Sequence, residues 1–257
     1  MKKLLFTTAI VSLLFAGCDK NNNGDDPNDP STETVKLLPS KIINGRDTTG
    51  FEYDGQNRLI RIVGMLQWSS VTPTVIMYDA NNNPTNVGGR SFRYVGNQIF
   101  DTRLDGYSRE RVDTLTINAN GRLEKIKEFV TIKTFTYDSR GSLTKIVREH
   151  DYGDEIYRDT IEFEHANSNA RSIWRHVNVP DWFVVYVLSD LSNFHHRTLS
   201  VTTTKNGLMP TLEQRFSWEN EIRFDYGIYP NGYISHITVA SGSESPRIYA
   251  IEWIPAK

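Results

Sequence analysis

Apolar and polar residues alternate along most of the chain with the period of two that is typical of β-strands. The clearest example is the stretch from Phe135 to Val147, in which Phe135 and Tyr137 alternate with threonines and a second apolar run follows Gly141. Asp138 can fold its carboxylate onto nearby backbone N–H groups, and Gly141 can adopt the left-handed conformation that closes a turn. The pattern therefore predicts a strand, a turn and a returning strand.

Variants of this hairpin unit recur along the chain. Predicted turns begin near residues 54, 79, 95, 118, 138, 165, 219 and 230. Because the spacing is irregular and consecutive strands usually pair, the units predict an antiparallel up-and-down meander. We expect an all-β domain of about 12–16 strands that forms a flattened barrel or a strongly curved sheet, since a flat open sheet of this size would leave its edges unprotected.

Three of the turns are followed by two apolar residues three positions apart. They are Leu59 and Ile62, Leu123 and Ile126, and Leu143 and Ile146. Residues three apart in a regular strand point to opposite faces. Either both faces of the sheet are partly covered, or a β-bulge after each turn returns both residues to one face. We favour the bulge.

The stretch 181–193 departs from the alternation. One face of a helix would carry Val184, Val187, Leu188 and Leu191, at positions i, i+3, i+4 and i+7. Asp181 is placed to cap the N-terminus of such a helix, although valine and tyrosine also favour strands. We expect a short helix here that plugs or covers the sheet.

The N-terminal residues have the pattern of an exported lipoprotein. Met1-Lys2-Lys3 precedes an apolar run that ends at Phe15 and is shorter than the about 20 residues that a transmembrane helix needs. Leu14-Phe15-Ala16-Gly17-Cys18 resembles the lipobox of bacterial lipoproteins, in which the signal is removed before a cysteine that carries lipid. Cys18 is the only cysteine, so it cannot form an internal disulfide. We expect a signal peptide over residues 1–17 and lipidation of Cys18.

Residues 18–34 predict a flexible tether. They are acidic, rich in asparagine and proline, and carry no apolar residue after Cys18, so they cannot bury enough surface to offset the entropy of ordering. Asp19-Lys20 and Asp25-Asp26 resemble the acidic segment that directs lipoproteins of Bacteroidota-type bacteria to the outer face of the outer membrane, and a merely solvated linker is the alternative. Residues 35–257 then predict a single β-meander or barrel-like domain.

The turns carry a motif that resembles a known family. Tyr-Asp-x-x-Gly-Arg/Ser-Leu-x-Lys-Ile is similar to the YD repeats of RHS-type proteins, which stack hairpins into a β shell. Together with the lipobox and the tether, it makes the chain resemble a domain-of-unknown-function family of Bacteroidota lipoproteins that is porin-like in fold. The matching positions are Tyr53, Asp54, Arg58, Leu59, Asn118, Gly121, Arg122, Leu123, Tyr137, Asp138, Gly141 and Leu143. The resemblance implies no known activity and supplies no catalytic residue.

Composition and motifs give little support to catalysis. The formal net charge of −2 predicts no nucleic-acid surface, and the sequence contains no serine-hydrolase, phosphate-loop or dinucleotide motif. We interpret His195-His196 and the acidic stretch 149–155 as loop or hairpin residues rather than as metal ligands. Most of the tryptophans are expected in the core rather than on a sugar-binding surface; they are Trp68, Trp174, Trp182, Trp218 and Trp253. We therefore predict no catalytic residue, no cofactor and no metal site.

Three functions stay open. The first is a lipid-anchored envelope protein at the outer-membrane surface that binds or scaffolds a glycan or a partner protein without catalysis. The second is a polysaccharide-acting hydrolase with two carboxylates in the mouth of a barrel. The third is a carrier of a lipophilic ligand in a hollow, apolar interior. Charged residues at many alternate strand positions argue against a membrane-spanning barrel, and the side chains that line the interior decide among the three functions.

Overall fold

The computed structural model describes residues 35–64, 73–151, 156–165, 172–188, 198–209, 214–241 and 245–257, with the backbone alone for residues 156, 198–209 and 214–220. The contacts divide the chain into two units, Met1–Thr32 and Glu33–Lys257, and all of the described residues belong to the second. The predicted signal peptide, Cys18 and the tether therefore lie outside the described residues.

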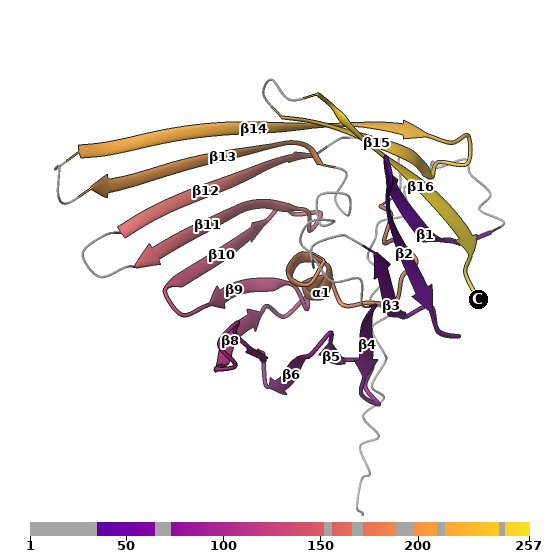
Figure 1. Ribbon diagram of the computed structural model, residues 1–257, viewed down its shortest axis with the longest axis horizontal. Helices are drawn as coiled ribbons and strands as arrows, with labels where there is room; N and C mark the ends of the chain where they lie inside the picture. Colours follow the sequence, from indigo (N-terminus) through magenta and orange to yellow (C-terminus); the bar gives the residue numbers. More distant parts are fainter. Residues whose placement is uncertain are drawn as a thin grey trace, which may run out of the picture. The chain divides into compact units, whose positions relative to one another are not determined.

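Sixteen antiparallel strands follow one another along the described chain (Figure 1). Their bounds are β1 Leu37–Asn44, β2 Asp47–Tyr53, β3 Leu59–Gly64, β4 Thr74–Tyr78, β5 Pro84–Val87, β6 Arg90–Val95, β7 Gln98–Leu104, β8 Glu110–Ile117, β9 Leu123–Lys127, β10 Thr131–Tyr137, β11 Leu143–Asp151, β12 Ile156–His165, β13 Thr198–Met209, β14 Gln214–Ile228, β15 Ile234–Ser241 and β16 Arg247–Pro255. Each strand pairs with the next, and β1 also pairs with β16, so the ring of strand pairs returns to its start. The predicted all-β, strongly curved up-and-down meander is confirmed.

Since every pair is antiparallel, successive connections alternate between the two ends of the barrel. We call one end the repeat end: it holds the turns that begin at residues 54, 79, 118, 138 and 229, the start of β1 and the end of β16. The other end, the far end, holds the turn at residues 105–109 and the connection at 128–130. The two ends differ in the chemistry that they expose.

Five turns share one geometry, which explains why the hairpin unit repeats. They begin at Asp54, Asp79, Asp105, Asn118 and Asp138. In each turn the side-chain Oδ1 of the first residue accepts hydrogen bonds from the backbone N–H groups two and four residues later. The residue three positions later has positive φ in every turn: it is asparagine or glycine, which tolerate that conformation best, in four of them, and Ser108 in the fifth.

The predicted β-bulge follows these turns. In the last of them Thr136 pairs with Lys145, but Tyr137 pairs with Leu143, so one residue of the returning strand has no opposite partner. The same shift follows the turns at Asp54, Asp79 and Asn118. It allows Leu143 and Ile146 to contribute to one core although they are three residues apart.

At six of the seven bulges in the described strands, an aromatic side chain of a neighbouring strand hydrogen-bonds to the backbone carbonyl at the bulge. The Tyr137 hydroxyl donates to the carbonyl oxygen of Leu123 at 2.8 Å, and the Tyr78 hydroxyl donates to that of Leu59 at 2.8 Å. Equivalent contacts join Tyr53 to Pro39, Tyr94 to Pro84, His165 to Leu143 and Trp253 to Ile234. Burial raises the pKa of the Tyr78 and Tyr137 hydroxyls above the usual range, so both stay protonated donors. The hydrogen bond from the hydroxyl explains why tyrosine, rather than phenylalanine, precedes the turns at Asp54, Asp79 and Asp138.

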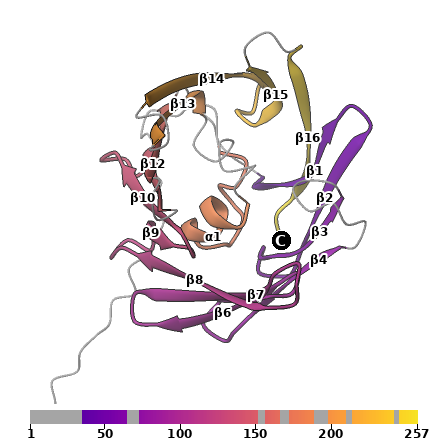
Figure 2. The same ribbon diagram turned by 60° about the vertical axis from the view of Figure 1, so that its left-hand side comes forward.

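Helix α1, Asp181–Tyr186, and the described chain that leads into it lie inside the ring of strands (Figure 2). This plug segment, residues 172–188, contains α1. Its buried residues are Ile173, Trp174, Val177, Trp182, Phe183, Val184, Val185, Val187 and Leu188. The ring of Trp174 packs edge-on against Phe51 at 5.3 Å, and that of Trp182 against Phe92 at 5.4 Å. The barrel and the plug segment thus share one hydrophobic core.

The predicted helix is confirmed over Asp181–Tyr186, and residues 189–193 of that prediction lie outside the described part of the chain. The N-cap is Pro180 rather than Asp181, whose carboxylate instead faces Arg122 at 3.5 Å. The helix is buried on more than the one predicted face because barrel strands surround it. No helix among the described residues is long and apolar enough to cross a membrane.

The predicted turn near residue 219 is wrong. β14 runs without interruption through this region, where Glu219 pairs with Thr204 and Asn220 pairs with Thr203. Asparagine suits a turn, but no glycine follows Asn220 before Ile222 to take a left-handed conformation. Continuous pairing with β13 therefore prevails over the local preference for a turn.

We predict that Tyr137→Phe lowers the free energy of unfolding by about 1–3 kcal/mol, because the carbonyl of Leu123 loses its donor in a partly buried site. Urea denaturation of the two proteins measures the difference. Tyr229→Phe is the matched control: this ring is 47% exposed, and we expect a change within about 0.5 kcal/mol. Equal losses in the two variants would contradict the role given to the ring.

Candidate functional site

The motif residues predicted from the sequence gather at the repeat end and are structural. Arg58 donates through Nε to the carboxylate of Asp54 at 2.6 Å, which braces the turn from within. The guanidinium of Arg122 lies over the ring of Tyr137, and Leu59, Leu123 and Leu143 are buried in the core. The remaining members, Tyr53, Asn118, Gly121, Asp138 and Gly141, form the bulge contact and the turns described above.

The plug segment is tied to these turns. The backbone N–H of Asn178 donates to the carbonyl of Asn57 at 2.9 Å, and the Asn178 side-chain oxygen accepts from Asn82 Nδ2 at 3.0 Å. The C-terminus joins the same place, where the N–H of Lys257 donates to Asn57 Oδ1 at 2.9 Å. The repeat end is therefore held together by its own turns, the plug segment and the C-terminus.

Charged side chains meet inside the barrel next to the plug segment. This inner network consists of Arg90, Asp101, Arg103, Asp113 and Tyr186, from β6, β7, β8 and α1. Asp101 and Asp113 are directly opposite in the β7–β8 ladder, where like charges repel. Arg103 Nη1 bridges them at 3.1 Å and 2.7 Å, and the single proton of the Tyr186 hydroxyl is shared between Asp101 at 2.7 Å and Asp113 at 3.2 Å.

The inner network brings two carboxyl groups together, as in a catalytic acid–base pair, but both groups are buried. Burial raises the pKa of the Asp113 carboxyl, although the positive charge of Arg103 opposes the shift. A raised pKa beside a second carboxylate is a feature of glycoside hydrolases. However, the side chains of Asp101 and Asp113 are only 0% and 5% exposed, and Arg90 also binds Asp101. The network therefore holds α1 in the barrel and offers no surface to a polymer.

A second set of interacting polar side chains comes from β10, β11 and β12. Asp159 is buried and accepts from Arg148 at 2.9 Å, and His150 Nε2 lies 3.5 Å from the same carboxylate. His150 Nδ1 also contacts the Thr131 hydroxyl at 3.0 Å. Its neighbour Glu149 pairs on the other face of the sheet with Arg158. Strand alternation thus separates the residues of the acidic stretch, of which 152–155 lie outside the described residues.

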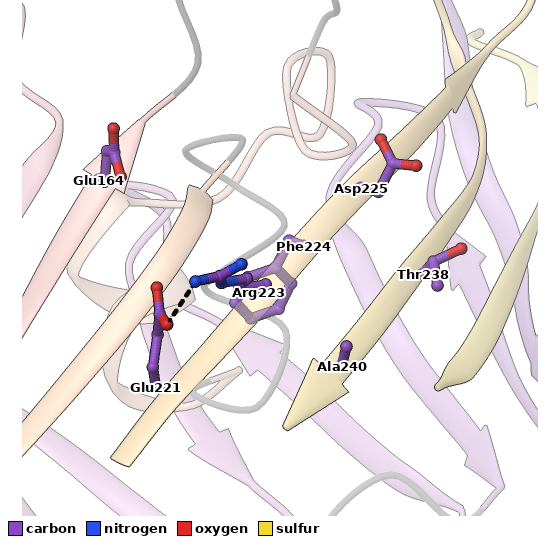
Figure 3. A pocket seen from close by; sticks show the side chains of 7 residues that line it. All are labelled: Glu164, Glu221, Arg223, Phe224, Asp225, Thr238 and Ala240. Carbon is purple, nitrogen blue, oxygen red and sulfur yellow. Dashed lines mark hydrogen bonds and ion pairs between the residues drawn. The ribbon is translucent and has the colours of Figure 1, made fainter. Parts of the chain in front are cut away.

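A shallow groove of about 460 Å³ crosses the outer face of the sheet (Figure 3). Its lining residues are Glu164, Glu221, Arg223, Phe224, Asp225, Thr238 and Ala240. Glu221 and Arg223 point toward each other and form an ion pair at 3.0 Å, whereas Asp225 lies farther along β14. This pairing neutralises the one guanidinium of the groove, so we assign the groove no function.

Two exposed aromatic rings stand at the far end. Tyr107, in the β7–β8 turn, is 82% exposed, and Phe129, between β9 and β10, is 85% exposed. Arg109 lies against the Tyr107 ring at 5.1 Å and Arg111 against the Phe129 ring at 5.4 Å. The Asp105 carboxylate binds both guanidinium groups. We call these five residues the far-rim cluster.

The far-rim cluster is not among the sites predicted from the sequence. Asp105 and Arg109 have the same spacing as Asp54 and Arg58, and this signal identifies the turn. No spacing along the chain indicates that Phe129, from the next hairpin but one, would join it. The contact with Arg111 depends on the pairing of β8 with β9.

The remaining candidate residues from the sequence are the tryptophans and His195-His196; some are buried, and others lie outside the described residues. Trp174 and Trp182 are each 2% exposed, which confirms their place in the core, and Trp253 packs partly buried against it. Trp68, His195 and His196 lie outside the described residues, as does the side chain of Trp218. Within the described ranges, no three histidine, cysteine or acidic residues come close enough to hold a metal ion.

No protein-family model matches the chain, and a search of curated proteins finds no match either. Among solved structures, the chain is similar to a porin-like protein from Bacteroides vulgatus ATCC 8482, with 12% identity over 86% of this chain and 100% of that chain and a TM-score of 0.37. It is also similar to a porin-like protein from Bacteroides uniformis ATCC 8492, with 15% identity over 88% of this chain and 98% of that chain and a TM-score of 0.36.

We predict that Tyr186→Phe lowers the free energy of unfolding by about 1.5–3 kcal/mol, because the buried Asp101 and Asp113 carboxylates lose the one O–H proton that they share. Urea denaturation compares the variant with the wild type, and Tyr229→Phe again serves as the control. A variant as stable as the wild type would contradict the structural role of the inner network.

The far-rim cluster predicts a specific pH dependence. Its hydrogen bonds, above all from the backbone N–H of Arg109, lower the pKa of the Asp105 carboxyl from 3.8 to about 2. The stabilisation is therefore fully present above about pH 4 and is lost as the pH falls through about 2. Asp105→Asn keeps an oxygen acceptor for the turn but has no charge to lose. We expect the difference in unfolding free energy between wild type and variant to shrink over this range; a constant difference would contradict the prediction.

Proposed function

We propose that this chain is a lipid-anchored protein of the bacterial cell envelope, displayed at the outer-membrane surface, with hairpins that resemble the YD repeats of RHS-type proteins. We propose further that it is a non-catalytic binding or scaffolding module for a glycan or a partner protein. The observation that carries this proposal is the position of the plug segment: its apolar side chains belong to the core inside the barrel, and the charges beside it are paired.

The interior gives little support to the two other functions. A hydrolase needs two carboxyl groups that a sugar chain can reach, and Asp101 and Asp113 are buried beneath Tyr186 and their arginine partners. A carrier of a lipophilic ligand needs a hollow apolar interior, but Trp174, Trp182 and Phe183 occupy the apolar part of this barrel. A binding module requires only a surface.

The outer face supports attachment through a lipid. It carries cross-strand ion pairs that join Lys41 to Glu252, Arg61 to Glu52, Lys145 to Glu162 and Arg158 to Glu149. An arginine or lysine that faces hydrocarbon near the middle of a bilayer costs about 2–4 kcal/mol. Such a face belongs in water, and a lipid on Cys18 would hold the domain at the membrane without inserting its strands.

Metabolic labelling tests the anchor. Cells that express the full chain in a Bacteroidota host are grown with radioactive palmitate, and the wild type is compared with Cys18→Ala. We expect the wild type to carry label and to sediment with membranes, and we expect the variant to lose the label. Equal labelling of the two proteins would overturn the proposed anchor.

Binding and catalysis are tested on the same purified chain. We expect retention of a glycan on an array or specific capture of an envelope protein, and no release of reducing sugar from the polysaccharides that bind. An empty array together with an empty pulldown would overturn the proposed module. Release of reducing sugar would overturn its non-catalytic character.

A further inference from the structure

We infer that the far-rim cluster is a carbohydrate-binding site, in which Tyr107 and Phe129 stack on sugar rings and Arg109 and Arg111 donate hydrogen bonds to sugar hydroxyl groups. This inference rests on the proposed function and gives it a place on the barrel and a class of ligand. The far-rim cluster lies at the far end of the barrel, whereas β1 begins at the repeat end.

The exposure of the two rings needs an explanation. Phe129 and Tyr107 are the two most exposed large hydrophobic residues in the described ranges, at 85% and 82%. Many of the other aromatic side chains of the barrel lie in the core or donate to the carbonyl groups at the bulges, and Tyr229 is 47% exposed. A ring left in water forgoes the free energy of burial that those rings contribute. Burial against a ligand would recover it.

The cluster is organised before any ligand binds. The carboxylate of Asp105 accepts from the backbone N–H groups of Tyr107 and Arg109 at 2.8 Å and 3.0 Å, which fixes its position. The same carboxylate accepts from Nε of Arg109 at 3.0 Å and of Arg111 at 3.2 Å. Each arginine then lies against one ring. One carboxylate thus orients both aromatic groups, which reduces the entropy lost on binding.

The chemistry of the cluster fits a neutral sugar. Arg109 and Arg111 both bind the Asp105 carboxylate, so this carboxylate offsets part of their positive charge within the cluster. The faces of aromatic rings are electron-rich, and a pyranose ring with equatorial hydroxyl groups presents weakly positive C–H groups on its flat faces. The guanidinium groups carry further N–H donors for the hydroxyl groups at the edge of the sugar.

A protein partner is the competing occupant. Leu104 and Val112 are 68% and 49% exposed on the strands next to the cluster, and they would extend an apolar surface. A stable protein interface buries roughly 800 Å² on each side and has an apolar centre with a polar rim. Here the centre of the cluster is the ion-paired Asp105, and the rings lie at its sides. This arrangement favours the sugar, and the test includes the protein as an outcome.

Affinity gel electrophoresis tests the inference with the full chain in detergent. Native gels contain barley β-glucan, xylan or polygalacturonate, and the retardation of the protein gives its affinity for each polymer. We expect retardation by a neutral polymer, and an affinity at least about tenfold lower in Tyr107→Ala and in Phe129→Ala. Tyr229→Ala is the matched control, because this tyrosine is exposed at the opposite end of the barrel. Urea midpoints of all variants should match the wild type, since the rings contribute little to the core.

The outcomes separate the inference from the proposed function. Retardation that is equal in the wild type and the Tyr107 and Phe129 variants would overturn the rim site and leave the binding module intact. Retardation by polygalacturonate alone would overturn the neutral ligand. If no polymer retards the wild type, the inference falls, and a protein captured by the wild type but not by Phe129→Ala would then identify the rim as a protein interface. Failure of the proposed module itself requires that the glycan array and the pulldown both stay empty.

Discussion

The hydrogen bond from an aromatic ring to the carbonyl group at a β-bulge is the interaction on which the barrel depends. The bulge is needed because the Asx turn and the apolar residues three apart cannot otherwise serve one core, as Leu143 and Ile146 show. A bulge interrupts the ladder of backbone hydrogen bonds. The hydroxyl of a tyrosine on a neighbouring strand then donates to the backbone carbonyl at the bulge. Each hairpin is thereby registered on its neighbour, and a one-residue slip would separate ring and carbonyl.

The second constraint is the width of the ring of strands. Barrels of about eight strands are filled by their own side chains, and a ring of sixteen needs additional material. The plug segment supplies it with Trp174, Trp182 and Phe183, and Figures 1 and 2 show α1 within the strands. Bulges, four of the five Asx turns and the hydrogen bonds to the plug segment lie at the repeat end, so this end holds the barrel and the plug segment together.

Polar groups of the interior serve the same packing. Asp101 and Asp113 face each other because the β7–β8 register demands it, and Arg103 and Tyr186 make that arrangement tolerable. Buried charges that are paired and hydrogen-bonded stabilise a unique arrangement of neighbours only at a desolvation cost. Their partners leave them no capacity for chemistry. In the far-rim cluster, by contrast, the rings of Tyr107 and Phe129 are exposed and contribute little to the core.

The sequence by itself determined the local structure: the strands, the turns at Asp54, Asn118 and Asp138, the bulges and the helix at 181–186. Each of these is decided by interactions within about five residues, such as an Asx side chain that accepts from its own backbone. The tertiary structure alone decided that β14 continues through Asn220, that Tyr186 reaches Asp101 across 85 positions, and that Phe129 joins Arg111. These contacts depend on register between strands, and register is fixed only when the whole ring of pairs forms.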